Sequence, residues 1–164
     1  MNLDSVIKRG CLPWRPRQDA SDLDVWHEYE IPLTGTFRIN GSLIVFTQVL
    51  ESSQGFSAWA YSCIREDDLA GLDSFSTVDD LRDYVESLFQ GREAVIALAK
   101  DDRLIDRWTR REVTEGLVPA VEAFLNDVIS SVNRVDDAGV RVRAKLAALD
   151  EGLDGAQAEL LATA

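Results

Sequence analysis

The sequence predicts an α+β fold in which an antiparallel β-meander is covered by helices and is followed by a helical C-terminal third. Residues 25–64 contain several short segments rich in β-branched and aromatic residues, separated by turn residues. Residues 78–91 place apolar side chains at helical spacing, and a seven-residue apolar pattern runs from about residue 117 onward. A chain of 164 residues also corresponds to about one domain.

The first strand is expected at Val25, where apolar and polar residues begin to alternate, with Pro32 marking an edge or an end. The clearest turn signal is Asn40-Gly41, which separates two β-rich segments. Both positions of a type I′ hairpin turn need positive φ, and these residue types tolerate it. We therefore expect three or four antiparallel strands over residues 25–64.

The strand expected over residues 56–64 should be covered on both faces, since the neighbouring segment 43–46 is apolar at every position. We interpret Cys63 as a small buried hydrophobic residue. The two faces of this strand are expected to carry Trp59 and Tyr61 on one side, and Phe56, Ala58 and Ala60 on the other.

After a predicted loop over residues 65–74, Ser76 or Thr77 is expected to cap a helix that ends at Gly91. Residues 93–115 fit either a β-hairpin or a broken helix. Their short β-branched segment favours the hairpin.

The C-terminal part shows two apolar series spaced by seven, as in the seam of a coiled coil or of a helix packed along a groove. We expect one helix over about 117–134 and a second over about 138–151. The second carries a narrow seam made of Leu146, Leu149, Leu153 and Leu160. A narrow seam suits another helix, so we predict that residues 140–161 contact a partner, the alternative being packing on the chain's own sheet.

The predicted organisation is an N-terminal tail or linker (1–24), an α+β domain (25–134) and a C-terminal helical extension (135–164). The net charge of −12 repels phosphate backbones, so no nucleic acid is expected as a partner. No apolar stretch approaches the ~20 residues that span a bilayer, and no secretory signal is evident. Two cysteines that match no metal or redox spacing fit a reducing cytoplasm, and an arginine-rich, lysine-poor composition hints at a bacterial source.

The motifs for common chemistries are missing. No phosphate-binding glycine loop and no G-x-S-x-G element occurs, so no cofactor is expected. His27 is the single histidine, and we interpret it as structural, with catalysis as the alternative. The acidic doublets are interpreted as solvated helix caps rather than as Mg²⁺ ligands. They are Asp67-Asp68, Asp79-Asp80, Asp101-Asp102 and Asp136-Asp137.

Two basic islands accompany tryptophans. One is Trp14 with Arg15 and Arg17; the other surrounds Trp108 and contains Arg103, Arg107, Arg110 and Arg111. In so acidic a chain, salt bridges to neighbouring carboxylates are the first expectation for these arginines. Contact with another protein is the second, and we include Trp14 and Arg15 in the predicted partner interface with the four leucines.

In element order the chain resembles the class I secretion-chaperone-like fold, which runs β-β-β-α-β-β-α and includes small acidic dimers. We predict a non-enzymatic, acidic, cytoplasmic protein-binding module, such as an immunity protein, inhibitor, chaperone or assembly adaptor. Its partner is expected to be another protein, possibly basic, or a second copy. The alternative is a carboxylate- or metal-dependent enzyme that uses the acidic doublets and His27.

Overall fold

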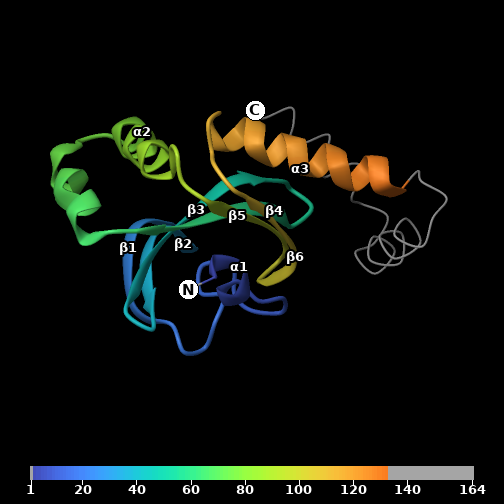
Figure 1. Ribbon diagram of the computed structural model, residues 1–164, viewed down its shortest axis with the longest axis horizontal. Coiled ribbons are helices and arrows are strands. Elements are labelled where there is room, and N and C mark those ends of the chain that lie inside the picture. Colours follow the sequence, from blue (N-terminus) through green and yellow to red (C-terminus); the bar gives the residue numbers. More distant parts are fainter. Residues whose placement is uncertain (1, 133–164) are drawn as a thin grey trace.

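The structure is a computed structural model that describes residues 2–132. Its elements in chain order are α1 (Leu3–Val6), β1 (Ser21–Tyr29), β2 (Ile31–Ile39), β3 (Ser42–Glu51), β4 (Phe56–Ile64), the 3₁₀ helix η1 (Glu66–Ser74), α2 (Val78–Phe89), β5 (Ala94–Lys100), β6 (Arg103–Arg110) and α3 (Leu117–Val132). The six strands form one antiparallel sheet in the order β1-β2-β3-β4-β5-β6. Helices α2 and α3 cover one face of this sheet and α1 covers the other (Figure 1).

The predicted α+β class, with an antiparallel sheet and covering helices, is confirmed. The four strands β1–β4 form the expected meander, and the hairpin alternative is confirmed for β5 and β6. The expected helix after residue 117 is α3. The second predicted helix, over about 138–151, lies outside the described residues.

Two local structures that the sequence predicts, a hairpin turn and a helix cap, are present as expected. Asn40 and Gly41 have φ angles of 52° and 80°, and they connect Ile39 to its partner Ser42 in a tight hairpin. The side chain of Thr77 accepts a hydrogen bond of 3.1 Å from the backbone N–H of Asp80 and so caps α2.

Each face of the sheet has its own hydrophobic core. In β4, Phe56, Ala58 and Ala60 pack under α2 and α3. Trp59 and Tyr61 are fully buried in the second core, on the face covered by α1. The predicted division of this strand is therefore confirmed, and both faces are covered.

Three local expectations were wrong. The first strand begins at Ser21, four residues before Val25, and the chain reverses at Glu30 (φ 62°) rather than continuing as one strand. Its register with β2 is irregular, which obscures a simple alternation. Residues 66–74 form the 3₁₀ helix η1 instead of a loop, and Cys63 is exposed rather than buried.

The N-terminal segment before β1 is anchored to the sheet. Leu3, Val6 and Ile7 are buried against the second core. The backbone of Leu104 in β6 donates to the carbonyl of Cys11 at 3.0 Å and accepts from the N–H of Gly10 at 2.8 Å. The segment therefore covers the beginning of the edge strand β6.

Across residues 2–132, no helix has the length and apolar character that crossing a bilayer requires.

Candidate functional site

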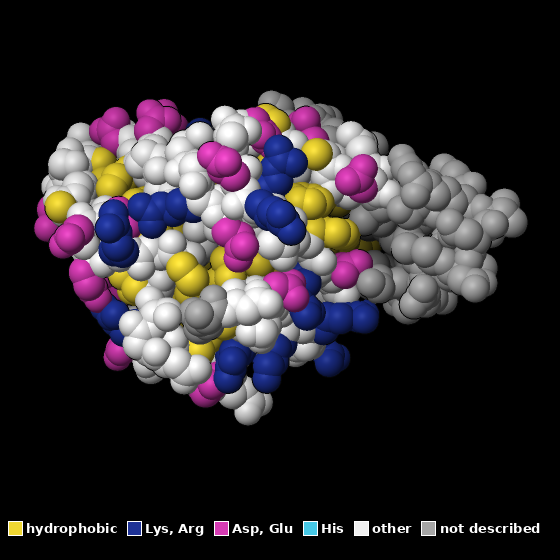
Figure 2. All heavy atoms as spheres, in the orientation of Figure 1, with side chains coloured by type: hydrophobic (Ala, Val, Ile, Leu, Met, Phe, Trp, Pro, Cys, Tyr) yellow, Lys and Arg dark blue, Asp and Glu magenta, His cyan; other side chains and the backbone are white. Residues whose placement is uncertain are grey.

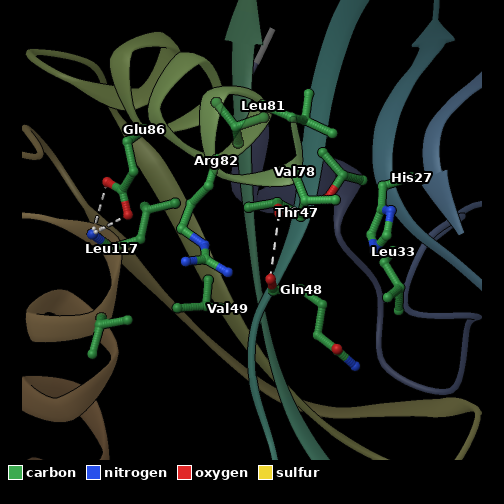
Figure 3. A pocket seen from close by; sticks show the side chains of 13 residues that line it. His27, Leu33, Thr47, Gln48, Val49, Val78, Leu81, Arg82, Glu86 and Leu117 are labelled. Atoms are coloured by element: carbon green, nitrogen blue, oxygen red, sulfur yellow. Dashed lines mark hydrogen bonds between the residues drawn. The ribbon is translucent and has the colours of Figure 1, made fainter. Parts of the chain in front are cut away.

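A groove lies between α2 and α3, with β2 and β3 as its floor (Figure 3). Its cavity volume is about 190 Å³. The apolar lining is made of Leu33, Val49, Val78, Leu81, Val85, Leu117 and Val118. Its polar lining is made of His27, Thr34, Thr47, Gln48, Arg82 and Glu86. We call this feature the α2–α3 groove.

Helix α2 supplies one wall because its apolar residues recur at helical spacing. Leu81 and Val85 are buried against the sheet, whereas Val78, one turn earlier, is 56% exposed at the mouth of the groove. An exposed valine next to two buried apolar residues leaves apolar surface that the described residues do not cover.

The floor of the groove is held by a cross-strand threonine pair. Thr34 of β2 lies opposite Thr47 of β3, and their hydroxyl oxygens are 2.9 Å apart. Both side chains are buried, and each hydroxyl can satisfy the other. The polar groups of the floor therefore already bond to each other, and the walls above them are apolar.

Glu86 joins the two helices that form the walls. Both of its carboxylate oxygens accept from the backbone N–H of Leu117, at 3.2 and 3.3 Å, where α3 begins (Figure 3). Burial raises the pKa of Glu86 and the charge of Asp83 adds to this, while the Leu117 N–H and Arg82 oppose it. The carboxylate satisfies an otherwise unpaired donor of the first helical turn.

Helix α2 carries an acidic stripe that includes Glu86 of the groove lining. Asp79, Asp83 and Glu86 follow one another at spacings of four and three, so they form one stripe along the helix. Arg82 contributes the opposing charge and lies 3.4 Å from a carboxylate oxygen of Asp79. Glu122 adds a further carboxylate on α3, one turn after Val118.

His27 lies on β1 and lines the groove at the end away from Glu86 (Figure 3). It is half-buried and pairs in register with Thr34. No group of three or more His, Cys, Asp or Glu side chains that could hold a metal ion was found in the searched part, residues 2–132.

The described acidic doublets are distributed over three places. Asp68 pairs with Arg92 at 2.8 Å, and this guanidinium lowers the pKa of the carboxyl group. Asp79 and Asp80 lie at the start of α2, and Asp101 and Asp102 form the turn between β5 and β6. The fourth doublet, Asp136-Asp137, lies outside the described residues.

Trp14 and Arg15, the described residues of the predicted partner interface, do not line the α2–α3 groove. Trp14 packs against the second core, and the Nε–H of Arg15 donates to the carbonyl of Ala20 at 3.0 Å. Leu146, Leu149, Leu153 and Leu160 lie outside the described residues, so their role stays a prediction.

Within the second basic island, Arg107 pairs with Asp4 at 3.0 Å and Arg110 pairs with Glu115 at 2.8 Å. Trp108 stacks on Phe124 of α3 with ring centroids 5.7 Å apart. The expected salt bridges are thus confirmed for Arg107 and Arg110, whereas Arg103 and Arg111 form none within residues 2–132.

Sequence reasoning did not identify the α2–α3 groove. The helical spacing of Val78, Leu81 and Val85 was visible, but nothing in the sequence says which helix lies opposite. Glu86 was missed because its partner is 31 positions away. Only the folded chain brings the two together.

Comparison of the chain with models of known protein families, with curated proteins and with solved structures gave no match.

Proposed function

We propose that this protein is a non-enzymatic protein-binding module, of the kind that immunity proteins, inhibitors, chaperones and assembly adaptors represent. Its binding site is the α2–α3 groove, and its ligand is an amphipathic, basic segment of a partner protein. The observation that carries the proposal is the uncovered apolar wall at Val78, 56% exposed beside a groove that the sheet and two helices hold open.

The size of the groove favours a partner's side chains over a free small molecule. Pockets for drug-sized ligands usually measure about 300–1,000 Å³, whereas this cavity measures about 190 Å³. A space of this size fits a few apolar side chains projecting from one segment. Helix-in-groove recognition places such side chains at spacings of three and four.

The charge along α2 specifies the rest of the partner. Asp79, Asp83 and Glu86 oppose one guanidinium on this helix, and Glu86 belongs to the lining of the groove. Lysine or arginine residues beside the apolar contacts of a partner would complement this field and accelerate encounter. An acidic segment would be repelled.

The test uses a fluorescent amphipathic Leu/Lys peptide of about 18 residues, roughly five helical turns. Anisotropy measures its affinity for the intact chain and for Val78→Asp and Val118→Asp. Both substitutions add negative charge, so attraction by charge alone would strengthen binding. We expect each to weaken binding about tenfold, because the loss of a buried valine contact is worth about 1.5 kcal/mol or more.

Tyr29→Asp is the matched control, since it adds the same charge at another exposed hydrophobic residue outside the groove. It should leave the affinity for the Leu/Lys peptide unchanged. Equal binding by the chain and both groove variants would refute the proposal. A Leu/Lys peptide of scrambled order that binds equally well would do the same.

An enzyme that uses carboxylates or a metal is the competing proposal. It predicts that Mg²⁺ or Mn²⁺ raises the melting temperature, and that Asp→Asn changes at one doublet abolish the increase. That result would favour the enzyme over the binding module.

A further inference from the structure

A second surface feature lies on the α1 side of the sheet, where the N-terminal segment meets the start of β6. Arg15, Arg17 and Arg103 line a hollow of about 420 Å³ there, together with Gly10, Leu12 and Asp102. Lys8 lies near the same place, because Arg17 and, more weakly, Lys8 lower the pKa of Asp19. We call the four cationic residues and Leu12 the N-terminal basic patch. Figure 2 shows lysine and arginine side chains gathered in the lower part of the view, where Figure 1 places this segment.

The backbone beneath the patch is fixed by several contacts. Besides the two hydrogen bonds to Leu104, the hydroxyl of Tyr61 donates to the carbonyl of Pro13, and Arg15 donates to that of Ala20. Tyr61 is fully buried in the second core. The segment that carries the patch is thereby tied to the sheet at both its edge and its centre.

The charges of the patch are largely uncompensated. Within residues 2–132, Lys8, Arg15 and Arg103 take part in no salt bridge, whereas Arg17 pairs with Asp19. The guanidinium of Arg103 lies 3.6 Å from the position that a β-carbon would take at Gly10. Three cations that have no carboxylate partner in the described part thus lie close together in a chain whose net charge is −12.

Leu12 adds an apolar element to the same hollow. Its side chain is 42% exposed, one of three large hydrophobic residues exposed in the described part of the chain. A hydrophobic residue surrounded by free cations suits a ligand with the reverse pattern, in which an apolar residue is flanked by carboxylates.

We propose that the N-terminal basic patch binds an acidic protein segment that carries an apolar residue, at a site separate from the α2–α3 groove. Nucleic acid fits less well. A nucleic acid presents a continuous row of phosphates, and a protein that depends on this row for its affinity neutralises about 6–10 of them. The patch has half as many cations, and the rest of the chain is acidic.

The experiment measures binding of a fluorescent peptide of glutamates with central leucines to the full chain. The double variant Lys8→Glu/Arg103→Glu tests the patch, and Leu12→Ser tests its apolar element. Arg111→Glu is the matched control, because Arg111 is likewise exposed, has no salt bridge in the described part and lies at the other end of β6. Circular dichroism melting checks that every variant folds.

We expect the double variant to lose at least about tenfold in affinity and Leu12→Ser to lose several-fold, with Arg111→Glu unchanged. Raising the salt from about 50 to 300 mM should weaken binding of the peptide to the unaltered chain. Equal binding by the unaltered chain and the double variant, or no binding by either, would overturn the proposal. Tighter binding of single-stranded oligothymidine than of the peptide would assign the patch to nucleic acid instead. A doubling of the mass in solution that the double variant abolishes would assign it to a second copy of the chain.

Discussion

At Gly35 the backbone of β1 lies directly against the backbone of β2. A β-carbon built at Gly35 would come within 2.1 Å of the carbonyl oxygen of Asp24 and 3.1 Å of the α-carbon of Val25. The register between the two strands is irregular at this point. A glycine inside a strand often marks such a close approach of two backbones, so the residue is needed here for its lack of a side chain.

Gly35→Ala should therefore destabilise the fold by about 1–3 kcal/mol, because backbone rather than a flexible side chain must move. The matched control is Gly116→Ala, where the nearest atoms would lie at 3.6 and 3.8 Å, an ordinary contact. Urea denaturation of both variants measures the difference. A loss at Gly35 no larger than at Gly116 would contradict the close approach.

Glu86 provides a second prediction at this scale. Glu86→Ala removes the acceptor for the Leu117 N–H and should cost about 0.5–2 kcal/mol, as the loss of a helix cap does. Glu86→Gln keeps one oxygen that can accept from this N–H, so it should lower the free energy of unfolding by less.

The stability of the unaltered chain and that of Glu86→Gln should respond differently to pH. Since burial raises the pKa of Glu86 above its ordinary value of 4.5, the folded state binds this proton more tightly than the unfolded state. The stabilising contribution is complete below the ordinary pKa and is lost as the pH rises through the raised pKa. The stability of Glu86→Gln relative to the unaltered chain should therefore improve from acid to neutral pH. If the difference between their free energies of unfolding stays constant from about pH 4 to about pH 7, the pKa of Glu86 is not raised by folding.

The β2–β3 hairpin allows a test at the scale of a single element. Gly41 has a φ of 80°, and a β-carbon there would meet nothing within 4 Å. Any effect of substitution must come from backbone strain. Gly41→Val should cost at least about 1–2 kcal/mol, whereas Gly41→Asn should be tolerated better because asparagine adopts positive φ more readily. Thermal melting of the two variants side by side checks this order.

Elements with local signals could be predicted from the sequence. The turn at Asn40-Gly41 and the cap at Thr77 depend on residues next to them, and the two faces of β4 follow from strict alternation. The α+β class follows from these elements because each needs another to cover its apolar face.

Features that depend on distant contacts could not be predicted. The contact between Glu86 and Leu117, and therefore one wall of the groove, has no local signature. The anchoring of Pro13 depends on Tyr61, 48 positions away, so this part of the chain had the composition of a tail. The irregular register at Gly35 likewise hid where β1 begins.

For the whole molecule, the two proposed sites lie on opposite faces of one sheet, and side chains of opposite charge accompany them. The acidic stripe of α2 meets the α2–α3 groove at Glu86, and the N-terminal basic patch carries cations. Fields of opposite sign on the two sides would orient partners of different chemistry toward different faces. A module of this kind could hold two segments at once.

The apolar seam predicted at the C-terminus leads to a prediction about assembly with a partner or a second copy. Truncation after Asp150 removes Leu153 and Leu160, and it should reduce the mass in solution or the affinity for a partner. Light scattering of the truncated chain beside one that ends at Leu161 measures the first effect. Unchanged mass, stability and partners would show that the seam is not an interface.

The sequential order of the six strands determines the order in which the molecule can assemble. Each strand pairs with the one made just before it, so the sheet can grow hairpin by hairpin as the chain leaves the ribosome. The N-terminal segment is the exception. Gly10 and Cys11 bond to Leu104, so residues synthesised first must wait for the last strand before they can dock. Segments near a chain end generally open at a lower free energy than the central strands of a core. In the native protein, the amide hydrogens of the N-terminal segment should therefore exchange with solvent before those of β3 and β4.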